Sequence, residues 1–289
     1  MNADTSPRIF DTELAAQRLA RAIAQGPADF LLRRASDDLD ERLGTVLRQF
    51  SAILDLGTPG EIFGKTARMR FPEATLRSLA FSDLSRSDGL GIAPESVDLA
   101  LSGLVLHLVN DLPGLLAQAR RTLKPDGLFM ACLPGGRTLQ ELRQCLAQAE
   151  SEVLGGISPR VAPFADIRDM GGLLQRAGFA LPVTDSEVLT LRYDNAFALM
   201  RDLRAMGATN ALADRLRKPT LRTLFIRAAE LYAEQFSDPD GRIRATIELV
   251  WLSGWAPHES QQKPLRPGSA KTRLADALGV PERPLTREN

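Results

Sequence analysis

The sequence predicts an α/β protein with a doubly wound, mostly parallel sheet, an antiparallel edge strand and a helical insertion in the C-terminal half. Apolar runs at residues 53–57 and 97–101 alternate with helical patterns. The first run ends in an acid and a glycine, which is typical of a buried parallel strand that opens into a turn. Lys124-Pro125-Asp126-Gly127 then separates a helix at residues 115–123 from a strand at residues 128–133, as a βαβ crossover requires.

Two helices are predicted before the first strand, because apolar residues recur at helical spacing in residues 14–23 and 39–50. A weaker strand at residues 75–81 ends near Asp83. We expect one large domain with three regions along the chain: N-terminal helices at 1–50, the α/β domain at 51–260 with a helical insertion at about 195–237, and a mostly unstructured tail at 261–289.

The C-terminal half continues the alternation of helices and strands. Two late segments, residues 189–193 and 243–251, have apolar residues at period two, and we expect them to pair as antiparallel edge strands. The remaining apolar patterns have helical spacing or helix-ending residues, and they predict helices at residues 138–153, 169–177, 197–206 and 221–236.

The charge pattern argues against several classes of partner. Lys plus Arg equals Asp plus Glu at 36 each, so no overall field attracts nucleic acid. The longest uncharged stretch, residues 99–110, is too short to span a bilayer, which leaves only peripheral membrane contact. The N-terminus has no apolar signal core, and we expect a cytoplasmic protein. Cys132 and Cys145 lack C-x-x-C spacing, and we expect two buried, reduced thiols rather than a metal site.

Several longer sequence segments resemble a known superfamily. Residues 97–129, VDLALSGLVLHLVNDLPGLLAQARRTLKPDGLF, resemble the fourth-to-fifth-strand segment of class I S-adenosylmethionine (SAM) methyltransferases. The start, PRIFDTELAAQRLARA, is similar to two families within it: the malonyl-carrier-protein methyltransferases of biotin synthesis, and a complex I assembly-factor family described as arginine hydroxylases. Residues 135–179 and 254–270 resemble the second family. The resemblance implies the class I methyltransferase fold.

The loop after the first strand departs from the superfamily pattern D-x-G-x-G-x-G, whose glycines bring backbone N–H groups close to the SAM carboxylate. The chain has DLGTPGE at residues 55–61, so without gaps proline and glutamate replace the second and third glycines. Pro59 removes an N–H and Glu61 adds a negative charge, and both changes weaken SAM binding. With a one-residue deletion, Gly60 serves as the second glycine and Glu61 moves past the contact.

Asp83 is the candidate acid for the ribose hydroxyls, and a solvated loop aspartate is the alternative interpretation. About 40 residues separate Asp55 from Val97, which is shorter than the family spacing and predicts that the family's third strand and its helix are missing. By resemblance, the cofactor contacts are expected from Asp55, Leu56, Gly57, Gly60, Asp83, Ser102, Gly103 and His107.

His107 matches the family's Leu-His-Trp position, with Leu108 in place of the tryptophan, and is the candidate polar group at the rim of the pocket. It is either a general base or a residue that positions substrate or structure.

The resemblance implies a SAM-using enzyme that modifies a protein side chain, plausibly an arginine of a respiratory complex I subunit. The altered loop favours an alternative, a degenerate member that binds its partner and assists assembly without turnover. A third reading, the carrier-protein methyltransferase of biotin synthesis, fits the C-terminal half less well.

Overall fold

The computed structural model describes residues 8–85, 88–164, 166–262, 275–276 and 279. The chain divides into two compact units, Met1–Pro257 and His258–Asn289, and the first contains the sheet. The tail expected from residue 261 onward lies almost wholly outside the described residues, so its unstructured character stays a prediction.

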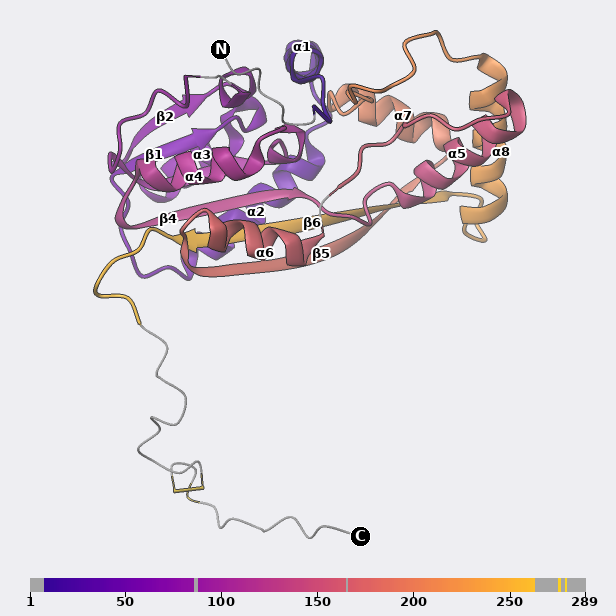
Figure 1. Cartoon of the computed structure of the whole chain (residues 1–289). Helices are drawn as coiled ribbons and strands as arrows, with labels where there is room; N and C mark the ends of the chain where they lie inside the picture. The colour runs from indigo at the N-terminus through magenta and orange to yellow at the C-terminus, as the bar shows by residue number, and fades with distance from the viewer. Residues whose placement is uncertain (1–7, 86–87, 165, 263–274, 277–278, 280–289) are drawn as a thin grey trace, which may run out of the picture. The chain divides into compact units, whose positions relative to one another are not determined.

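The described part of the first unit is built on one six-stranded sheet with the order β2-β1-β3-β4-β6-β5 (Figure 1). Strands β2, β1, β3 and β4 are parallel neighbours, whereas β6 runs antiparallel to both β4 and β5. The predicted doubly wound, mostly parallel sheet is therefore confirmed. The strands are β1 (Ala52–Leu56), β2 (Thr75–Leu79), β3 (Val97–Gly103), β4 (Leu123–Pro134), β5 (Ala180–Tyr193) and β6 (Ile243–Trp255).

The sheet lacks one strand of the superfamily sheet, as the short interval between Asp55 and Val97 predicts. In the described part of the connection from β2 to β3, the one regular element is the 3-10 helix η2 (Phe81–Ser85). Strand β2 is consequently an edge strand, and its side chains are only partly buried.

The two late strands pair as predicted, with Leu189 opposite Ile247, but both are longer than their alternating patterns. Strand β5 starts at Ala180, because the chain already pairs with β6 directly after the preceding helix. Of these two strands, only β5 lies at an edge of the sheet. Strand β6 is an interior strand, since it also pairs with β4, and here the expectation of two edge strands is wrong.

Helices cover both faces of the sheet. Neighbouring residues of one strand point to opposite faces, so Ile53 packs with α2 and α3 whereas Leu54 packs in the cluster that includes α4 and α6. The helices are α1 (Thr12–Gln25), α2 (Phe30–Gly44), α3 (Ile62–Arg70), α4 (Leu112–Thr122), α5 (Gln140–Leu154), α6 (Ile167–Arg176), α7 (Ala196–Ala205) and α8 (Arg222–Phe236).

Helices α5, α7 and α8 gather around one end of the long strands β5 and β6 (Figure 1). The last residue of β4, Pro134, pairs with Leu249, so residues 243–248 of β6 continue past the carboxyl end of β4. The Tyr232 hydroxyl of α8 donates a hydrogen bond to the Arg244 carbonyl of this extension at 2.9 Å. The insertion thereby lies at the carboxyl edge of the parallel strands, where folds of this kind bind ligands.

Candidate functional site

The Asp55 carboxylate organises the loop that follows β1. One oxygen accepts a hydrogen bond from the Thr58 backbone N–H at 3.0 Å, and the other accepts one from the Gly64 N–H at 2.8 Å. Burial raises the pKa of Asp55 to about 6, against the lowering effect of these hydrogen bonds. Asp55 thus ties the strand, the turn and the start of α3 together.

Gly64 is a residue of this loop region that the sequence reasoning missed. A Cβ at this position would lie 2.8 Å from Leu76 Cδ1 and 3.0 Å from an Asp55 carboxylate oxygen. Only glycine therefore lets the first turn of α3 approach the sheet so closely. The signal in the sequence is a glycine in the first turn of the helix that follows the acid-glycine turn.

The Pro59–Glu61 turn is a 3-10 helix (η1) in which Gly60 and Glu61 both have left-handed backbones, with φ of 63° and 58°. The Glu61 side chain is about half exposed, and its carboxylate lies 3.8 Å from Lys65 Nζ. Glu61 does not line the cavity described below, whereas Pro59 and Gly60 do. The negative charge of Glu61 therefore faces solvent and not the cavity.

Hydrogen bonds within the chain join the carboxyl ends of β1 and β3. The Gly103 N–H donates to the Thr58 hydroxyl at 2.9 Å, and the Ser102 hydroxyl donates to the Leu56 carbonyl at 2.7 Å. All of these groups are buried. A Cβ on Gly57 would lie 2.9 Å from Leu84 Cδ1, which shows how closely η2 covers that glycine.

Asp83 lies in η2, and its carboxylate accepts a hydrogen bond from the Ala80 N–H at 3.0 Å. It stabilises its own turn, and it does not line the cavity.

A cavity of about 720 Å³ lies next to this edge of the sheet. Helices α1, α5 and α7 contribute to its wall, together with the segment after α7 and two residues of β6, Ile247 and Leu249. Among the predicted cofactor contacts, Gly60 and His107 line the cavity. The other six lie outside its lining: Asp55, Leu56, Gly57, Asp83, Ser102 and Gly103.

His107 belongs to a short 3-10 helix (η3, Leu106–Leu108) after β3. Its ring packs against Phe164 with a centroid distance of 5.7 Å. The Nδ1 atom is buried and has no hydrogen-bond partner among the described residues. Burial lowers the pKa of His107 to about 3, so the imidazole is neutral at physiological pH.

Five arginines and one aspartate, Asp29, line the cavity. Two of the arginines have carboxylate partners at its border. Arg160 pairs with Glu150 at 2.6 Å, and Arg215 pairs with Asp11 at 3.0 Å. The other three are Arg18, Arg204 and Arg217.

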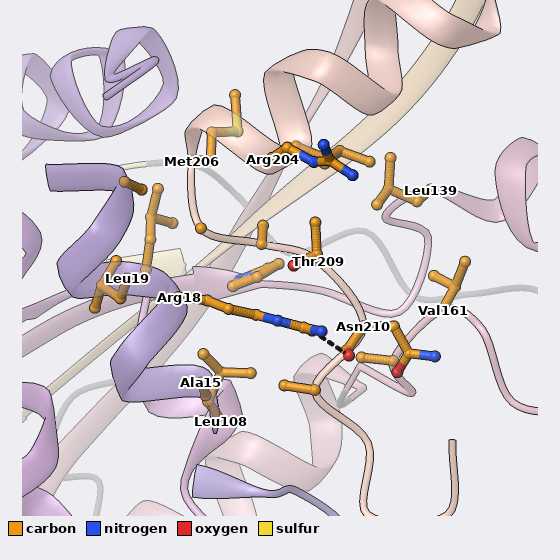
Figure 2. A pocket seen from close by; sticks show the side chains of 18 of the residues that line it. Ala15, Arg18, Leu19, Leu108, Leu139, Val161, Arg204, Met206, Thr209 and Asn210 are labelled. Atoms are coloured by element: carbon orange, nitrogen blue, oxygen red, sulfur yellow. Dashed lines mark hydrogen bonds between the residues drawn. The ribbon is translucent and has the colours of Figure 1, made fainter. Parts of the chain in front are cut away.

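Arg18 reaches from α1 across the cavity to the backbone carbonyl of Asn210, to which it donates a hydrogen bond (Figure 2). Arg204, which belongs to α7, lines the same cavity (Figure 2). These residues come from segments far apart in the sequence.

Both cysteines are buried and free, as predicted, and burial raises the pKa of Cys145 to about 11. Among the described residues, no group of three or more His, Cys, Asp and Glu side chains is placed to hold a metal ion. None of the described helices combines the length and the apolar character needed to cross a membrane.

Residues 61–131 match the model of a methyltransferase domain. The chain is 34% identical over 263 residues to "Arginine-hydroxylase NDUFAF5, mitochondrial" of Danio rerio, which covers 86% of this chain and 82% of that protein. It is 33% identical over 268 residues to "Malonyl-[acyl-carrier protein] O-methyltransferase" of Laribacter hongkongensis, covering 83% and 88% of the two chains.

The Dictyostelium discoideum protein with the same arginine-hydroxylase name is 47% identical over 191 residues, or 66% of this chain. The match covers 44% of that protein, so the chain spans less than half the length of this relative.

Proposed function

Because this chain belongs to the family of the arginine-hydroxylases NDUFAF5, within the class I methyltransferase superfamily, we propose that it modifies a protein side chain, namely an arginine of a respiratory complex I subunit. The observation that carries the proposal is the match to the Danio rerio protein over 82% of its length.

The loop residues do not fit SAM in the manner expected from the superfamily. The Asp55 carboxylate is occupied by two backbone N–H groups, and Leu84 covers Gly57, the first glycine of the loop. Asp83 holds its own turn instead of facing a ligand.

This packing supports a second function: a member of the family that binds its protein partner and assists assembly without SAM-dependent turnover. The two functions differ in what the cavity does. In the first, His107 contacts the substrate or orients it. In the second, His107 is a packing residue whose neutral ring lies against Phe164.

Mass spectrometry of complex I subunits separates the two functions. In cells that lack the endogenous protein, the wild-type chain is expected to restore a modified arginine, which is detected as an increase in the mass of that residue. His107→Gln should remove this modification if the first function holds, and His258→Gln, at the other histidine of the chain, is the matched control. If the wild-type chain restores assembly of complex I but no arginine is modified, the enzymatic function is wrong and the assembly function is supported.

Calorimetric titration tests the fit of SAM directly. The wild-type chain should bind SAM weakly or not at all, and Leu84→Ala should strengthen binding, because it uncovers Gly57. Leu90→Ala removes another buried leucine of the same core cluster and serves as the control. Micromolar binding by the wild type would show that Leu84 moves aside and that SAM fits after all.

The cytoplasmic location, the protein partner and the lack of nucleic-acid binding stay predictions. The relatives from Danio rerio and Dictyostelium discoideum are named as mitochondrial proteins, so cell fractionation in the source organism is the relevant measurement.

A further inference from the structure

The cavity combines an apolar wall with a cationic centre. Its wall includes leucine, isoleucine and methionine side chains from α1, α5, α7 and β6. Arg18 crosses this space, and Leu108 and Leu139 are among the apolar residues around it (Figure 2). Such a lining suits a ligand that has an apolar body and one polar end.

The charges around the cavity do not balance. The strongest charged neighbours of Arg18 are three arginines, Arg21, Arg204 and Arg215, and one carboxylate, Asp11, which already pairs with Arg215. The contact that Arg18 itself makes is to a neutral backbone carbonyl. Burial lowers the pKa of Arg18, and the nearby arginines lower it further, yet a guanidinium remains charged at physiological pH.

A partly buried cation without a carboxylate partner is costly unless a ligand supplies the negative charge. Among the described residues, neither Arg18 nor Arg204 forms an ion pair with a carboxylate. Two guanidiniums that line one cavity can together donate several hydrogen bonds to a carboxylate or a phosphate.

We propose that this cavity binds a small amphipathic anion, whose carboxylate or phosphate contacts Arg18 and Arg204 and whose apolar body lies against the leucine-rich wall. The neutral imidazole of His107 lines the same cavity and has a free Nδ1 for a further polar group of that ligand.

Binding of this anion is separate from the proposed modification of an arginine and does not depend on it. A substrate arginine would meet like charges next to Arg18, so the arginine of a protein substrate is expected outside this part of the cavity. The anion is then a separate small-molecule ligand, whether or not the chain modifies an arginine.

Isothermal titration of the full chain with probes of one chain length tests the proposal. Decanoate and decyl phosphate carry the anionic end, decanol is neutral, and decylamine is cationic. We expect at least one anion to bind about tenfold tighter than decanol, as a charge-assisted hydrogen bond implies, and decylamine to bind less tightly than decanol. Decanoate alone or decyl phosphate alone would assign the source of the anion.

Variants then locate the contact. Arg18→Gln and Arg204→Gln should each weaken binding of the anion by about tenfold without changing binding of decanol. Arg204 is exposed and forms no ion pair with a carboxylate among the described residues, so its variant reports on binding even if Arg18→Gln fails to fold. Arg21→Gln lies on the same helix as Arg18, outside the cavity lining, and is the matched control.

Equal affinity for decanoate, decyl phosphate, decanol and decylamine would overturn the proposal, because the cavity would then select only for apolar surface. Anion binding that neither Arg18→Gln nor Arg204→Gln weakens would overturn it as well, since the anion would lie elsewhere.

Discussion

Asp55 and Gly64 are joined by a hydrogen bond of 2.8 Å, in which the Gly64 backbone N–H donates to the Asp55 carboxylate. One buried side chain at the end of β1 thereby satisfies a backbone group at the start of α3, a position where helices leave their N–H groups unpaired. The contact joins strand and helix across the cofactor loop of the superfamily, and it holds even though Pro59 and Glu61 replace the usual glycines.

The raised pKa of Asp55 predicts a specific pH dependence of stability. Its pKa is about 6 in the folded protein, above its ordinary value of 3.8, because burial disfavours the charge. The folded state therefore binds more protons between pH 4 and 6, and stability falls as pH rises through this window. A shift of this size corresponds to roughly 3 kcal/mol.

Urea unfolding of the wild type and Asp55→Asn between pH 4 and 7 measures this effect. The amide cannot ionise, so the free energy of unfolding of the wild type relative to the variant should fall by roughly 3 kcal/mol as pH rises. The variant also loses one acceptor, which lowers its stability at every pH. A difference that stays constant, or grows with pH, would contradict the assignment of the titration to Asp55.

Gly64 gives a second prediction, because a side chain there has no room. Gly64→Ala should lower the free energy of unfolding by about 1–2 kcal/mol, since the clash with Leu76 and Asp55 exceeds the gain in helix propensity. Gly172→Ala in α6 is the matched control, because a Cβ there meets no atom within 4 Å. It should raise stability by about 0.5–1 kcal/mol. Thermal or urea unfolding of both variants decides the matter, and equal effects would argue against the close approach of α3 to the sheet.

The neutrality of His107 gives a third prediction. The chain has two histidines, so the imidazole signals in a proton NMR spectrum can be assigned with a His258→Gln variant. The His107 signal should not move between pH 5 and 8, because burial lowers the pKa of His107 to about 3. A midpoint inside that range would mean that the ring is hydrated, and a general-base role would then gain support.

The sequence predicted the core of the fold because its signals are local. Apolar runs and the acid-glycine turn after β1 each report on a few consecutive residues, and they correspond to elements of the structure. The turn predicted at Lys124–Gly127 is wrong in its place, because β4 already starts at Leu123 and these residues form an irregularity in its pairing with β3. The absence of the superfamily's third strand could also be predicted, because the interval between Asp55 and Val97 is too short for a further strand and helix. The start of β5 at Ala180 could not be predicted, because residues 180–188 have no clear alternating pattern. Pairing with β6 defines this part of the strand.

The cavity could not be predicted in this way. Arg18 and Asn210 meet across 192 positions of sequence, and no spacing or propensity links α1 to the segment after α7. The direction of the Glu61 side chain was equally hidden, because it depends on a left-handed backbone at a non-glycine residue, which motif comparison does not reveal. The local sequence motif therefore identified the loop, whereas tertiary packing determines which groups the loop residues face.

The pair of Glu150 and Arg160 gives the last prediction, because it anchors the segment after α5 at the border of the cavity. The Glu150 side chain is buried, the Arg160 side chain is mostly buried, and the two lie 2.6 Å apart. Ser158 donates two further hydrogen bonds to Glu150. Despite burial, the Arg160 and Ser158 contacts hold the pKa of Glu150 at about 2, below its ordinary value of 4.5. Stability from this pair is thus present above pH 4.5 and is lost as pH falls toward 2.

Glu150→Gln should lower the free energy of unfolding by about 3 kcal/mol at pH 7, because it leaves the Arg160 charge buried without a carboxylate. The deficit relative to the wild type should shrink as pH falls below 4.5, where the wild-type carboxylate also becomes protonated. Glu152→Gln, two residues further along α5, breaks an exposed pair with Arg227 and should cost less than about 1 kcal/mol. If the two variants lose equal stability at pH 7, the Glu150 pair does not anchor the segment, and the cavity border must be held by apolar packing around Val161 and Phe164 instead.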